Sequence, residues 1–235
     1  MRRTLAWDGC FNVRDLGGIP TRDGGALRTG ALVRSDAVDR LTRRGWEALW
    51  AHGVRTVIDL RNDDELRPDA APRPSALTTL HLPLDGVEDR EFWDHWGDGR
   101  HGTPLYYRPF LDRFPERTAR VAEAVAHAEP GGVLFHCRIG RDRTGLIALL
   151  LLLLAGAGPE AVAEDFERST GRLAAYFAAQ GVPDQAPDVA AALRRAGTTA
   201  REQILALATD FDAAAHLRQG GLDEHTLRAL RARLR

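Results

Sequence analysis

The sequence predicts an α/β fold, with a central, mostly parallel sheet of about four or five strands flanked by helices. Between residues 27 and 154, short apolar runs alternate with helical patterns, which is typical of sheets built from parallel strands. After residue 154 the pattern is helical to residue 235, so we expect helices to form the C-terminal part. A chain of 235 residues suffices for a substantial core, and we expect 1–235 to form a single domain.

Four apolar runs are the candidate strands. Each is bounded by residues that favour turns, such as Gly, Pro, Asn and Asp. The first of them has the pattern of a strand followed by a turn, and the other three are short enough to be buried strands. In chain order they are Leu27–Arg34, Val54–Leu60, Leu80–Leu84 and Val133–Phe135.

Helical periodicity and capping residues predict helices between and after these runs. Thr42 can cap a helix that Gly53 ends, with one apolar face: Trp46, Leu49 and Trp50. Leu146–Ala157 is apolar throughout, is too short to span a bilayer, and suits a buried central helix. The other helical segments are Arg117–Ala128, a helix from Pro159, Arg172–Gln180, and two helices capped by Thr198 or Thr199 and by Asp223.

The most informative stretch is Gly131–Leu154. It reads GGVLFHCRIGRDRTGLIALLLLLL, which we interpret as a strand, a tight loop and a helix, with Cys137 in the loop. The N–H groups of a loop that opens onto a helix N-terminus can bind an anion. The same electrostatic field favours the thiolate of Cys137, and the thiolate is the nucleophilic form of cysteine.

Arg143 lies six residues after Cys137, and this spacing suits phosphate chemistry. Its planar guanidinium can grip two phosphate oxygens at once, which an ammonium cannot do. Thr144 can donate its hydroxyl to the thiolate and make the sulfur a better leaving group. The chain has no Lys and 32 Arg, so the spacing alone is weak evidence, and the neighbouring His136 and Gly140 strengthen it. The alternative is a buried, inert Cys at the end of a strand.

The segment HCRIGRDRTG resembles the signature loop of cysteine-dependent protein tyrosine phosphatases. It is most similar to the loop of the bacterial tyrosine/serine phosphatases, H-C-x-x-G-K-D-R-T-G. The resemblance implies a phosphotyrosine-phosphatase-like fold and a substrate site formed by the loop: Arg138, Ile139, Gly140, Arg141 and Thr144. Arg141 stands where the family usually has Lys, and Ile139 where a small residue is common. Both positions face the substrate in such loops, so these departures concern specificity more than chemistry.

A second segment, FNVRDLGG at Phe11–Gly18, is similar to the N-F-R-D-x-G-G segment of the same family. This resemblance implies that Asn12, Arg14 and Asp15 support the catalytic loop. The alternative is an ordinary N-terminal turn with a surface ion pair. Residues 34–36, Arg-Ser-Asp, resemble a further segment of the family.

The resemblance also implies a general acid, an Asp on a loop well upstream of the nucleophile. Asp85 occupies the corresponding place, directly after the run Leu80–Leu84. The alternative is a turn residue, which is the commonest use of Asp before Gly. Asp142, inside the loop itself, is the main rival for the role of acid, because geometry decides such roles. Three further carboxylates are lower-ranked candidates for the acid: Asp59, Glu88 and Asp89.

Together these residues predict hydrolysis of a phosphate monoester in two steps, without a metal or another cofactor. The Cys137 thiolate attacks phosphorus while Arg143 and the loop amides hold the equatorial oxygens. Asp85 protonates the leaving oxygen, which leaves a phosphocysteine, and the same carboxylate then activates water. We expect His136 to fix the loop and to help keep Cys137 ionised. It has no second residue at the spacing of a metal ligand.

The expected substrate is phosphotyrosine in a protein, with phosphoserine and phosphothreonine also open. A basic loop rim at Arg138 and Arg141 equally suits phosphoinositides or inositol phosphates, and the family includes lipid-active members. A phosphate-binding pseudoenzyme is a further alternative, although such proteins usually lose the Cys or the Arg. A sulfur-transfer domain is disfavoured because it would leave Asp85 without a role.

Composition narrows the partners and the compartment. The net charge of −1 gives no electrostatic case for nucleic acid or an acidic membrane as a partner. The N-terminus lacks the apolar region of a signal peptide, and two Cys far apart suit a reducing cytoplasm. We therefore expect a cytoplasmic monomer with no membrane-spanning segment.

Two features have two interpretations each. The aromatic residues between 92 and 107 either wall the substrate cleft or form a satellite hydrophobic cluster: Phe92, Trp93, Trp96, Tyr106 and Tyr107. Cys10 either resolves an oxidised Cys137 as a disulfide or is an unrelated buried residue.

Overall fold

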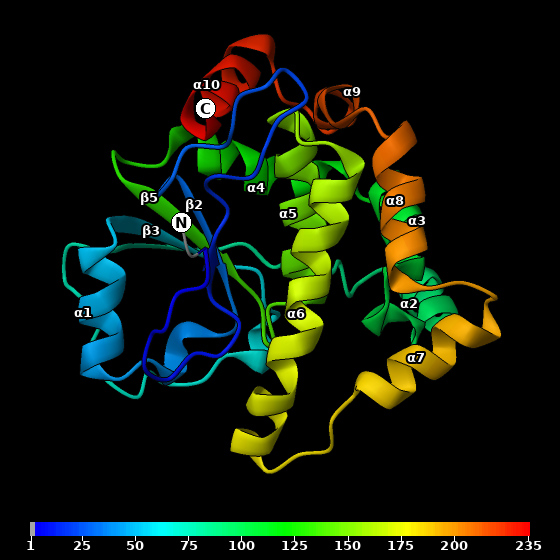
Figure 1. Ribbon diagram of the computed structural model, residues 1–235, viewed down its shortest axis with the longest axis horizontal. Helices are drawn as coiled ribbons and strands as arrows, with labels where there is room; N and C mark the ends of the chain where they lie inside the picture. The colour runs from blue at the N-terminus through cyan, green and yellow to red at the C-terminus, as the bar shows by residue number, and fades with distance from the viewer. Residues whose placement is uncertain (1–2) are drawn as a thin grey trace.

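Residues 3–235, the part of the chain that the computed structural model describes, contain a five-stranded sheet (Figure 1). The strand order is β1-β2-β5-β3-β4. β1 runs antiparallel to β2, and the other three pairs are parallel. The predicted α/β fold with a mostly parallel sheet is confirmed. The strands are β1 Arg14–Asp15, β2 Leu32–Ser35, β3 Val54–Asp59, β4 Thr78–His81 and β5 Gly132–His136.

The three central strands end at the same edge of the sheet. Ser35 of β2 and Asp59 of β3 both lie opposite His136, the last residue of β5. Cys137 is the next residue of the chain. Ligands of open α/β sheets bind outside the carboxyl ends of the strands. The register of the sheet therefore brings the segments after β2, β3 and β5 together around Cys137.

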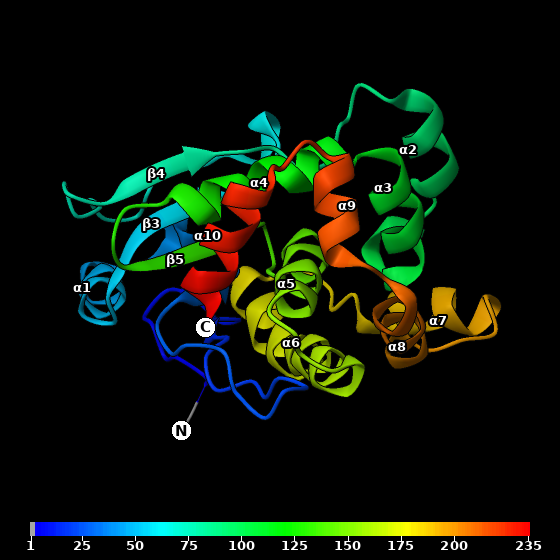
Figure 2. The same ribbon diagram turned by 90° about the horizontal axis from the view of Figure 1, so that it is seen from above.

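Different parts of the chain cover the two faces of the sheet, because successive strand residues point to opposite faces. One face packs against α1 (Arg43–Ala51) and the N-terminal segment, through Val33, Val57 and Leu134. The other face joins the larger core cluster, through Leu32, Ile58, Val133 and Phe135. This cluster includes apolar residues of α4 (Pro115–His127) and α5 (Asp142–Leu154). Figures 1 and 2 show α1 on one side of the strands and α5 on the other.

Helices form the C-terminal part of the protein, as the sequence predicts. α6 lies beside α5 in both views (Figures 1 and 2), and its bounds are Pro159–Gln180. After it come α7 Ala186–Arg195, α8 Ala200–Asp210, α9 Ala213–Gln219 and α10 Glu224–Leu234. Two short helices lie between β4 and α4: α2 Arg90–Trp96 and α3 Tyr107–Arg113.

Several predicted helix boundaries are confirmed. Thr42, Thr199 and Asp223 each accept a hydrogen bond from a main-chain N–H three residues later and cap α1, α8 and α10. Gly53 follows the end of α1 with φ +97°, a conformation that glycine adopts at low cost. The apolar part of α5 is buried, as predicted. No helix within residues 3–235 is both long and apolar enough to cross a membrane.

The strand predicted at Leu80–Leu84 lies too far along the chain compared with the observed strand β4. β4 comprises Thr78–His81, because Pro83 has no N–H with which to continue the ladder. The chain still follows β3 for a few residues, since the Leu82 N–H donates to the carbonyl at the end of β3 at 2.8 Å. This segment carries Asp85 to the edge of the sheet where Cys137 lies.

Candidate active site

The loop between β5 and α5 is short and closely packed. It comprises Cys137–Arg141, and Asp142 begins α5. Gly140 has φ +71°, and a Cβ there would lie 2.5 Å from the carbonyl oxygen of Ser35. Only glycine suits both the conformation and the space. The loop therefore rests against the end of β2, and Cys137 is 2% exposed.

Two carbonyl groups of the loop accept hydrogen bonds from the side chains of Asn12 and Arg34. Asn12 Nδ2 donates to the carbonyl oxygens of Ile139 and Gly140 at 3.1 and 3.0 Å. Arg34 Nη2 donates to the Gly140 oxygen at 2.8 Å. The N–H groups of residues 138–141, in contrast, donate to no atom of residues 3–235. Unsatisfied donors at the start of a helix are able to bind an anion.

A buried ion cluster supports the side chains behind the loop. Arg14 and Arg34 pair with Asp165 of α6 at 3.0 and 2.8 Å, and all three side chains are at most 1% exposed. Arg14 also donates to Asn12 Oδ1 at 2.7 Å. Burial and the charge of Arg34 lower the pKa of Arg14 to about 10. Although burial opposes them, the two guanidinium groups hold the pKa of Asp165 well below its ordinary value.

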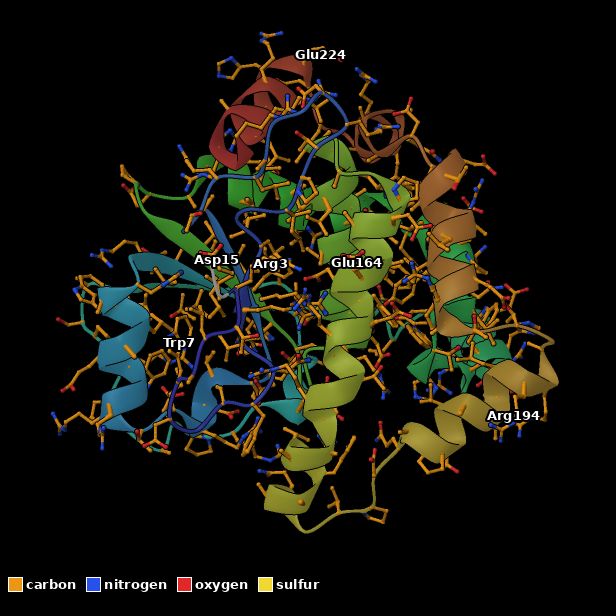
Figure 3. The ribbon with its side chains drawn as sticks, in the orientation of Figure 1. Arg3, Trp7, Asp15, Glu164, Arg194 and Glu224 are labelled. Carbon is orange, nitrogen blue, oxygen red and sulfur yellow. The ribbon has the colours of Figure 1, made fainter. Side chains whose placement is uncertain are left out.

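Asp15 has a different place from the one predicted for it. Its Oδ1 accepts a hydrogen bond from the Gly17 N–H at 2.7 Å, and its Oδ2 accepts one from the Gly30 N–H at 2.8 Å. Oδ2 also lies 3.0 Å from His52 Nε2, at the end of α1. Figure 3 labels Asp15 among the side chains near the N-terminal segment. Asp15 thus ties the turns around β1 and β2 to α1, which corrects the prediction that it supports the catalytic loop.

Arg143, in the first turn of α5, is held by two carboxylates. Glu65, the last residue of the 3-10 turn Asp63–Glu65, binds both terminal nitrogens, with Nη2 and Oε1 2.7 Å apart. Asp85 Oδ2 lies 3.1 Å from Nη1. Despite burial, the charges of Glu65, Asp85 and Cys137 raise the pKa of Arg143. Within residues 3–235 the Nε–H has no partner, so this edge of the guanidinium is available to a ligand.

Asp85 is largely buried beside Arg143. Its Oδ2 accepts a hydrogen bond from Asn62 Nδ2 at 3.0 Å, and its main-chain oxygen accepts one from Trp93 Nε1 at 2.9 Å. Burial raises the pKa of Asp85 above its ordinary value, although the charge of Arg143 acts in the opposite direction. A carboxyl group with a raised pKa keeps its proton to a higher pH, which is the property that a general acid needs.

The side chains of Arg141 and Asp142 pair with each other. Arg141 Nε lies 2.9 Å from Asp142 Oδ1, and Arg141 Nη2 donates to Gln185 Oε1 at 3.2 Å. Arg141 is 6% exposed, so its guanidinium is not on the loop rim where we expected it. Helix α7 begins directly after Gln185 and helps to cover it. Arg138 is exposed, and no residue in 3–235 pairs with its side chain.

Two other predicted loop residues are fully buried. His136 Nδ1 lies 3.2 Å from the Cys137 carbonyl oxygen, and its Nε2 is 3.7 Å from Asp59 Oδ2. Burial lowers the pKa of His136, which favours a neutral ring. Thr144 Oγ1 is buried and has no hydrogen-bond partner among residues 3–235, so the expected hydrogen bond to the sulfur of Cys137 is not formed in this structure.

The loop residue Ile139 is also covered. It is 8% exposed and packs in a small cluster with Leu173, Tyr176 and Phe177 of α6. Phe11 packs against the same cluster. The side chain of Ile139 therefore anchors the loop to α6 in this structure and does not form a substrate-facing surface.

The remaining carboxylates considered as acids have partners elsewhere. Asp59 binds Arg61 at 2.8 Å, Glu88 binds Arg117, and Asp89 caps α2 by accepting from the Phe92 N–H at 3.0 Å. None of these three carboxylates pairs with Arg143 within residues 3–235. Over the same residues, no three His, Cys, Asp or Glu side chains are grouped as a metal site.

The aromatic residues between 92 and 107 mainly pack against one another. Tyr106 and Tyr107 are at most 2% exposed and belong to the large core cluster with Phe92 and Phe110. Trp93 and Trp96 lie at the border of this cluster. Tyr107 also donates its hydroxyl to the Asp142 carbonyl oxygen at 2.8 Å and so supports the start of α5. This arrangement is the hydrophobic cluster, the second of the two interpretations.

Both cysteines are free thiols. Cys10 Sγ lies 3.5 Å from the carbonyl oxygen of Ala37, which follows β2. Burial and the charge of Asp36 raise the pKa of Cys10 well above its ordinary value, so the thiolate is disfavoured. A disulfide between Cys10 and Cys137 stays a prediction.

Three site residues escaped the sequence interpretation. Asn62 and Glu65 contact Asp85 and Arg143 from the segment after β3. Their signal was a possible capping box, because Asn62 and Glu65 satisfy each other's main-chain N–H groups. Asp165 was detectable as a charged residue on the apolar face of α6, between Val162 and Phe166.

Residues 5–235 match the tyrosine phosphatase family. The chain is 29% identical over 222 residues to a tyrosine-protein phosphatase of Nostoc commune, covering 89% of this chain and 76% of that protein. It is 28% identical over 191 residues to the triple specificity protein phosphatase PtpB of Mycobacterium tuberculosis, covering 68% and 67%. The crystal structure of P. aeruginosa TpbA aligns with a TM-score of 0.47 at 18% identity, covering 94% of this chain and 99% of that one.

Proposed function

Because this chain belongs to the tyrosine phosphatase family, we propose that it hydrolyses phosphotyrosine in proteins through a phosphocysteine at Cys137. One observation carries this proposal. Arg143, which follows the Cys137 loop in the first turn of α5, lies 3.1 Å from the largely buried carboxyl group of Asp85. These contacts support a site in which a nucleophile, a phosphate-binding guanidinium and a carboxyl group with a raised pKa act together.

In the first step the Cys137 thiolate attacks phosphorus in line with the phenolic oxygen. The N–H groups of residues 138–141 and the Nε edge of Arg143 hold the three equatorial oxygens, where the transition-state charge is spread. The S–P bond forms as the P–O bond to tyrosine breaks. Protonated Asp85 gives its proton to the leaving oxygen, so tyrosine departs as the neutral phenol.

In the second step water attacks the phosphocysteine. Asp85, now ionised, takes a proton from the water, the P–O bond forms and the S–P bond breaks. The products are inorganic phosphate and the Cys137 thiolate. Thr144, whose hydroxyl is buried without a partner among residues 3–235, donates a hydrogen bond that stabilises the leaving sulfur.

The loop keeps its shape through this cycle because hydrogen bonds from neighbouring side chains fix its carbonyl groups. Asn12 and Arg34 bind the carbonyl oxygens of residues 139 and 140, and His136 lies against the carbonyl of Cys137. A site in which donors are already oriented does not have to reorganise when charge develops. Arg14 contributes indirectly, by fixing the Asn12 side chain.

The phosphoinositide alternative loses part of its support. It depended on a rim formed by Arg138 and Arg141, and the Arg141 side chain is buried against Asp142 and Gln185. Arg138 alone is exposed for a second phosphate. We therefore propose phosphotyrosine, and not a phosphoinositide, as the main substrate. Phosphoserine and phosphothreonine remain within the proposal because PtpB, a similar protein, is named for triple specificity.

The decisive experiment is turnover of a phosphotyrosine peptide in the presence of a chelator, with two substitutions. Cys137→Ser should abolish turnover and retain peptide binding by isothermal titration, because the anion site survives without its nucleophile. Arg143→Lys should bind the peptide weakly and turn it over slowly, since an ammonium cannot form the two parallel hydrogen bonds of a guanidinium. Turnover by Cys137→Ser within about tenfold of the wild type would rule out the covalent mechanism.

We further propose that the protein acts in the cytoplasm as a monomer. Its nucleophile must stay a reduced thiolate, and a reducing compartment preserves such a thiol. Both cysteines are free here, in keeping with that environment. Cell fractionation and light scattering on the purified protein test the two statements separately.

A further inference from the structure

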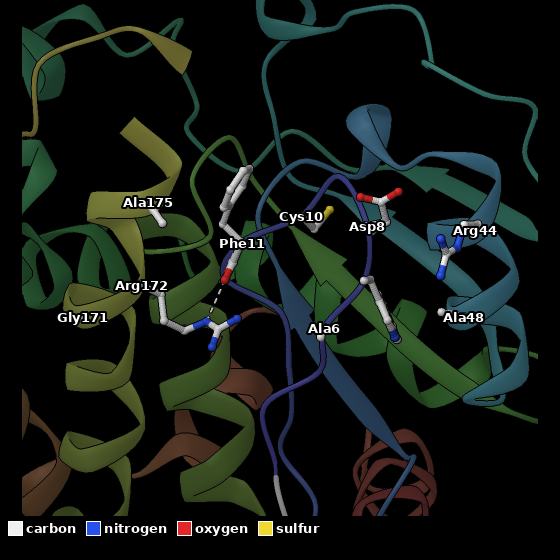
Figure 4. Close-up of a pocket in the computed structure, with 10 residues that line it drawn as sticks. Ala6, Asp8, Cys10, Phe11, Arg44, Ala48, Gly171, Arg172 and Ala175 are labelled. Atoms are coloured by element: carbon white, nitrogen blue, oxygen red, sulfur yellow. Dashed lines mark hydrogen bonds between the residues drawn. The ribbon is translucent and has the colours of Figure 1, made fainter. Parts of the chain in front are cut away.

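A cavity lies between α6, α1 and the N-terminal segment (Figure 4). Its volume is about 750 Å³, and its walls include Trp7, Asp8, Cys10, Phe11, Arg44 and Arg172. We call it the Arg172 groove. None of the residues that line it belongs to the catalytic loop or contacts Arg143, so it is separate from the candidate active site.

Arg172 is a partly buried cation without a counterion. Its Nε donates to the carbonyl oxygen of Phe11 at 2.7 Å, as Figure 4 shows, and its terminal nitrogens have no partner within residues 3–235. Burial and the charge of Arg14 lower its pKa, which means that its surroundings disfavour the charged form. An anion bound in the groove would supply the missing partner.

The carboxylate whose charge acts on Arg172 is that of Asp36, and it already has other partners. Asp36 accepts hydrogen bonds from the main-chain N–H groups of Phe11 and Asn12, at 3.1 and 2.9 Å. It also accepts one from Arg40 Nη2 at 2.9 Å. Arg14 and Arg34 share the carboxylate of Asp165, whereas Arg172 has no ion pair within residues 3–235.

A second guanidinium faces the groove from the opposite wall. Arg44 of α1 is exposed, and the structure assigns it no ion pair within residues 3–235. The single acidic side chain among the lining residues is Asp8, whose carboxylate accepts a hydrogen bond from Thr42 at 2.8 Å. Two arginines against one engaged carboxylate give the groove a positive potential, which attracts anionic groups.

Two short series of hydrogen bonds connect the groove to the catalytic loop. Arg172 holds the carbonyl of Phe11, and the next residue, Asn12, holds the loop carbonyls at positions 139 and 140. On its other side, Cys10 contacts the Ala37 carbonyl, and the Ala37 N–H donates to the Arg138 carbonyl at 3.1 Å. A peptide that leaves the active site past the exposed Arg138 therefore reaches the groove within a few residues.

We propose that the Arg172 groove binds an acidic side chain of the phosphoprotein substrate, a short distance along the chain from its phosphotyrosine. The inference rests on the proposed phosphotyrosine hydrolysis. A carboxylate can accept two parallel hydrogen bonds from a guanidinium, and Trp7 and Phe11 offer apolar walls to the peptide around it. A recessed groove with Asp8 in its wall fits a chain segment better than a flat anionic membrane.

The test compares phosphotyrosine peptides that differ in one residue. In a neutral peptide, a single Glu is moved stepwise along both sides of the phosphotyrosine, and each Glu peptide is paired with its Gln counterpart. The readout is the ratio of kcat/KM for the two members of a pair. At the position that reaches the groove, the ratio should be about fivefold for the wild type, the upper range for a partly exposed ion pair. It should fall at high salt.

Two substitutions and a matched control assign the effect to the groove. Arg44→Gln and Arg172→Gln should each lower the ratio toward one. Arg44 is the safer variant because its side chain is exposed and holds no other element in place. Arg120→Gln, an equal loss of charge on the exposed side of α4, should leave the ratio at its wild-type value.

The outcomes separate this inference from the proposed function. Absence of turnover on every phosphotyrosine peptide would refute the function itself. Normal turnover with a ratio of one at all positions, or an equal fall in Arg120→Gln, would refute the groove. Binding to phosphatidylserine vesicles that disappears in Arg44→Gln, without any effect on the peptide ratio, would also overturn it and would assign the groove to a membrane surface.

Discussion

The indole N–H of Trp93 donates to the main-chain oxygen of Asp85 at 2.9 Å and to that of Gly86 at 3.1 Å. Trp93 belongs to α2, and its ring lies 6.3 Å from that of Tyr106 and 6.4 Å from that of Phe110. The segment that carries the proposed acid is thereby attached to the aromatic part of the core. The orientation of the Asp85 carboxyl group consequently depends on a residue of another element.

Trp93→Phe should therefore weaken acid catalysis while preserving an aromatic ring in the cluster. Loss of a hydrogen bond of about 1–1.5 kcal/mol predicts a roughly tenfold slower hydrolysis of a phosphotyrosine peptide. An aryl phosphate with an acidic phenol needs little help and should be slowed less. Trp96→Phe, in the same helix, is the control. Equal slowing on both substrates would mean that Trp93 serves only packing.

Asp85→Asn should show the same dependence on the leaving group more strongly. The phenolate of tyrosine has a pKa of about 10, so hydrolysis of its phosphate should fall by roughly 10²–10⁴ without a positioned acid. Asp142→Asn is the comparison, because Asp142 is paired with Arg141 in the structure. If Asp142→Asn has the larger effect on tyrosine phosphate, the assignment of the acid is wrong. Steady-state kinetics on a tyrosine phosphate and on an aryl phosphate with an acidic phenol decides between Asp85 and Asp142.

The pH dependence gives an independent test of Asp85. The group acts while protonated, and burial raises its pKa above the ordinary value. The wild-type kcat/KM for tyrosine phosphate should therefore decline as pH rises through that raised pKa, because the acid loses its proton there. In Asp85→Asn this decline should be absent. A profile of unchanged shape in the variant would assign the alkaline decline to another group.

Glu65→Gln tests the orientation of Arg143. Glu65 binds both terminal nitrogens of the guanidinium and leaves the Nε edge free. The neutral amide cannot accept both hydrogen bonds, so the guanidinium should lose its fixed direction, with a loss of up to about 100-fold in kcat/KM, the effect of a misplaced catalytic group. Asp64→Asn is the matched control, since Asp64 is exposed in the same turn. Equal kinetics for the two variants would contradict this role.

Asp165→Asn should destabilise the protein, because Arg14 and Arg34 would be left buried without their carboxylate. Breaking a buried pair costs about 3–5 kcal/mol of unfolding free energy. The pKa of Asp165 is lowered in the folded state, so its stabilisation is complete above pH about 4 and is lost as pH falls through the lowered value. The difference in Tm between wild type and variant should therefore be largest near neutral pH.

The matched control for this measurement is Glu164→Gln. Glu164 is the preceding residue of α6 and is exposed (Figure 3). Its substitution should change Tm little at any pH, since surface substitutions rarely matter to stability. A difference between Asp165→Asn and the wild type that stays constant from pH 7 to well below 4 would show that packing, not charge, is lost.

Features with local signals in the sequence were the ones that could be predicted. The strand, loop and helix around Cys137 are contiguous, so His136, Cys137, Gly140 and Arg143 together predict an anion site with a nucleophile. Apolar periodicity and capping residues such as Thr42 and Asp223 marked the helices, because these preferences act over one or two turns. The same local signals placed the third predicted strand, Leu80–Leu84, too far along the chain, since β4 comprises Thr78–His81.

Which side chains meet at the site depends on contacts between distant parts of the chain. Glu65 lies 78 residues before Arg143 in the chain and yet binds it, and Asp165 reaches Arg14 from 151 residues away. No periodicity or motif encodes such pairs. They follow from the parallel register that aligns the ends of β3 and β5, and from the packing of α6 behind the loop. Burial of Arg141, which local sequence cannot reveal, likewise involves a distant residue, because its guanidinium donates to Gln185, which precedes α7.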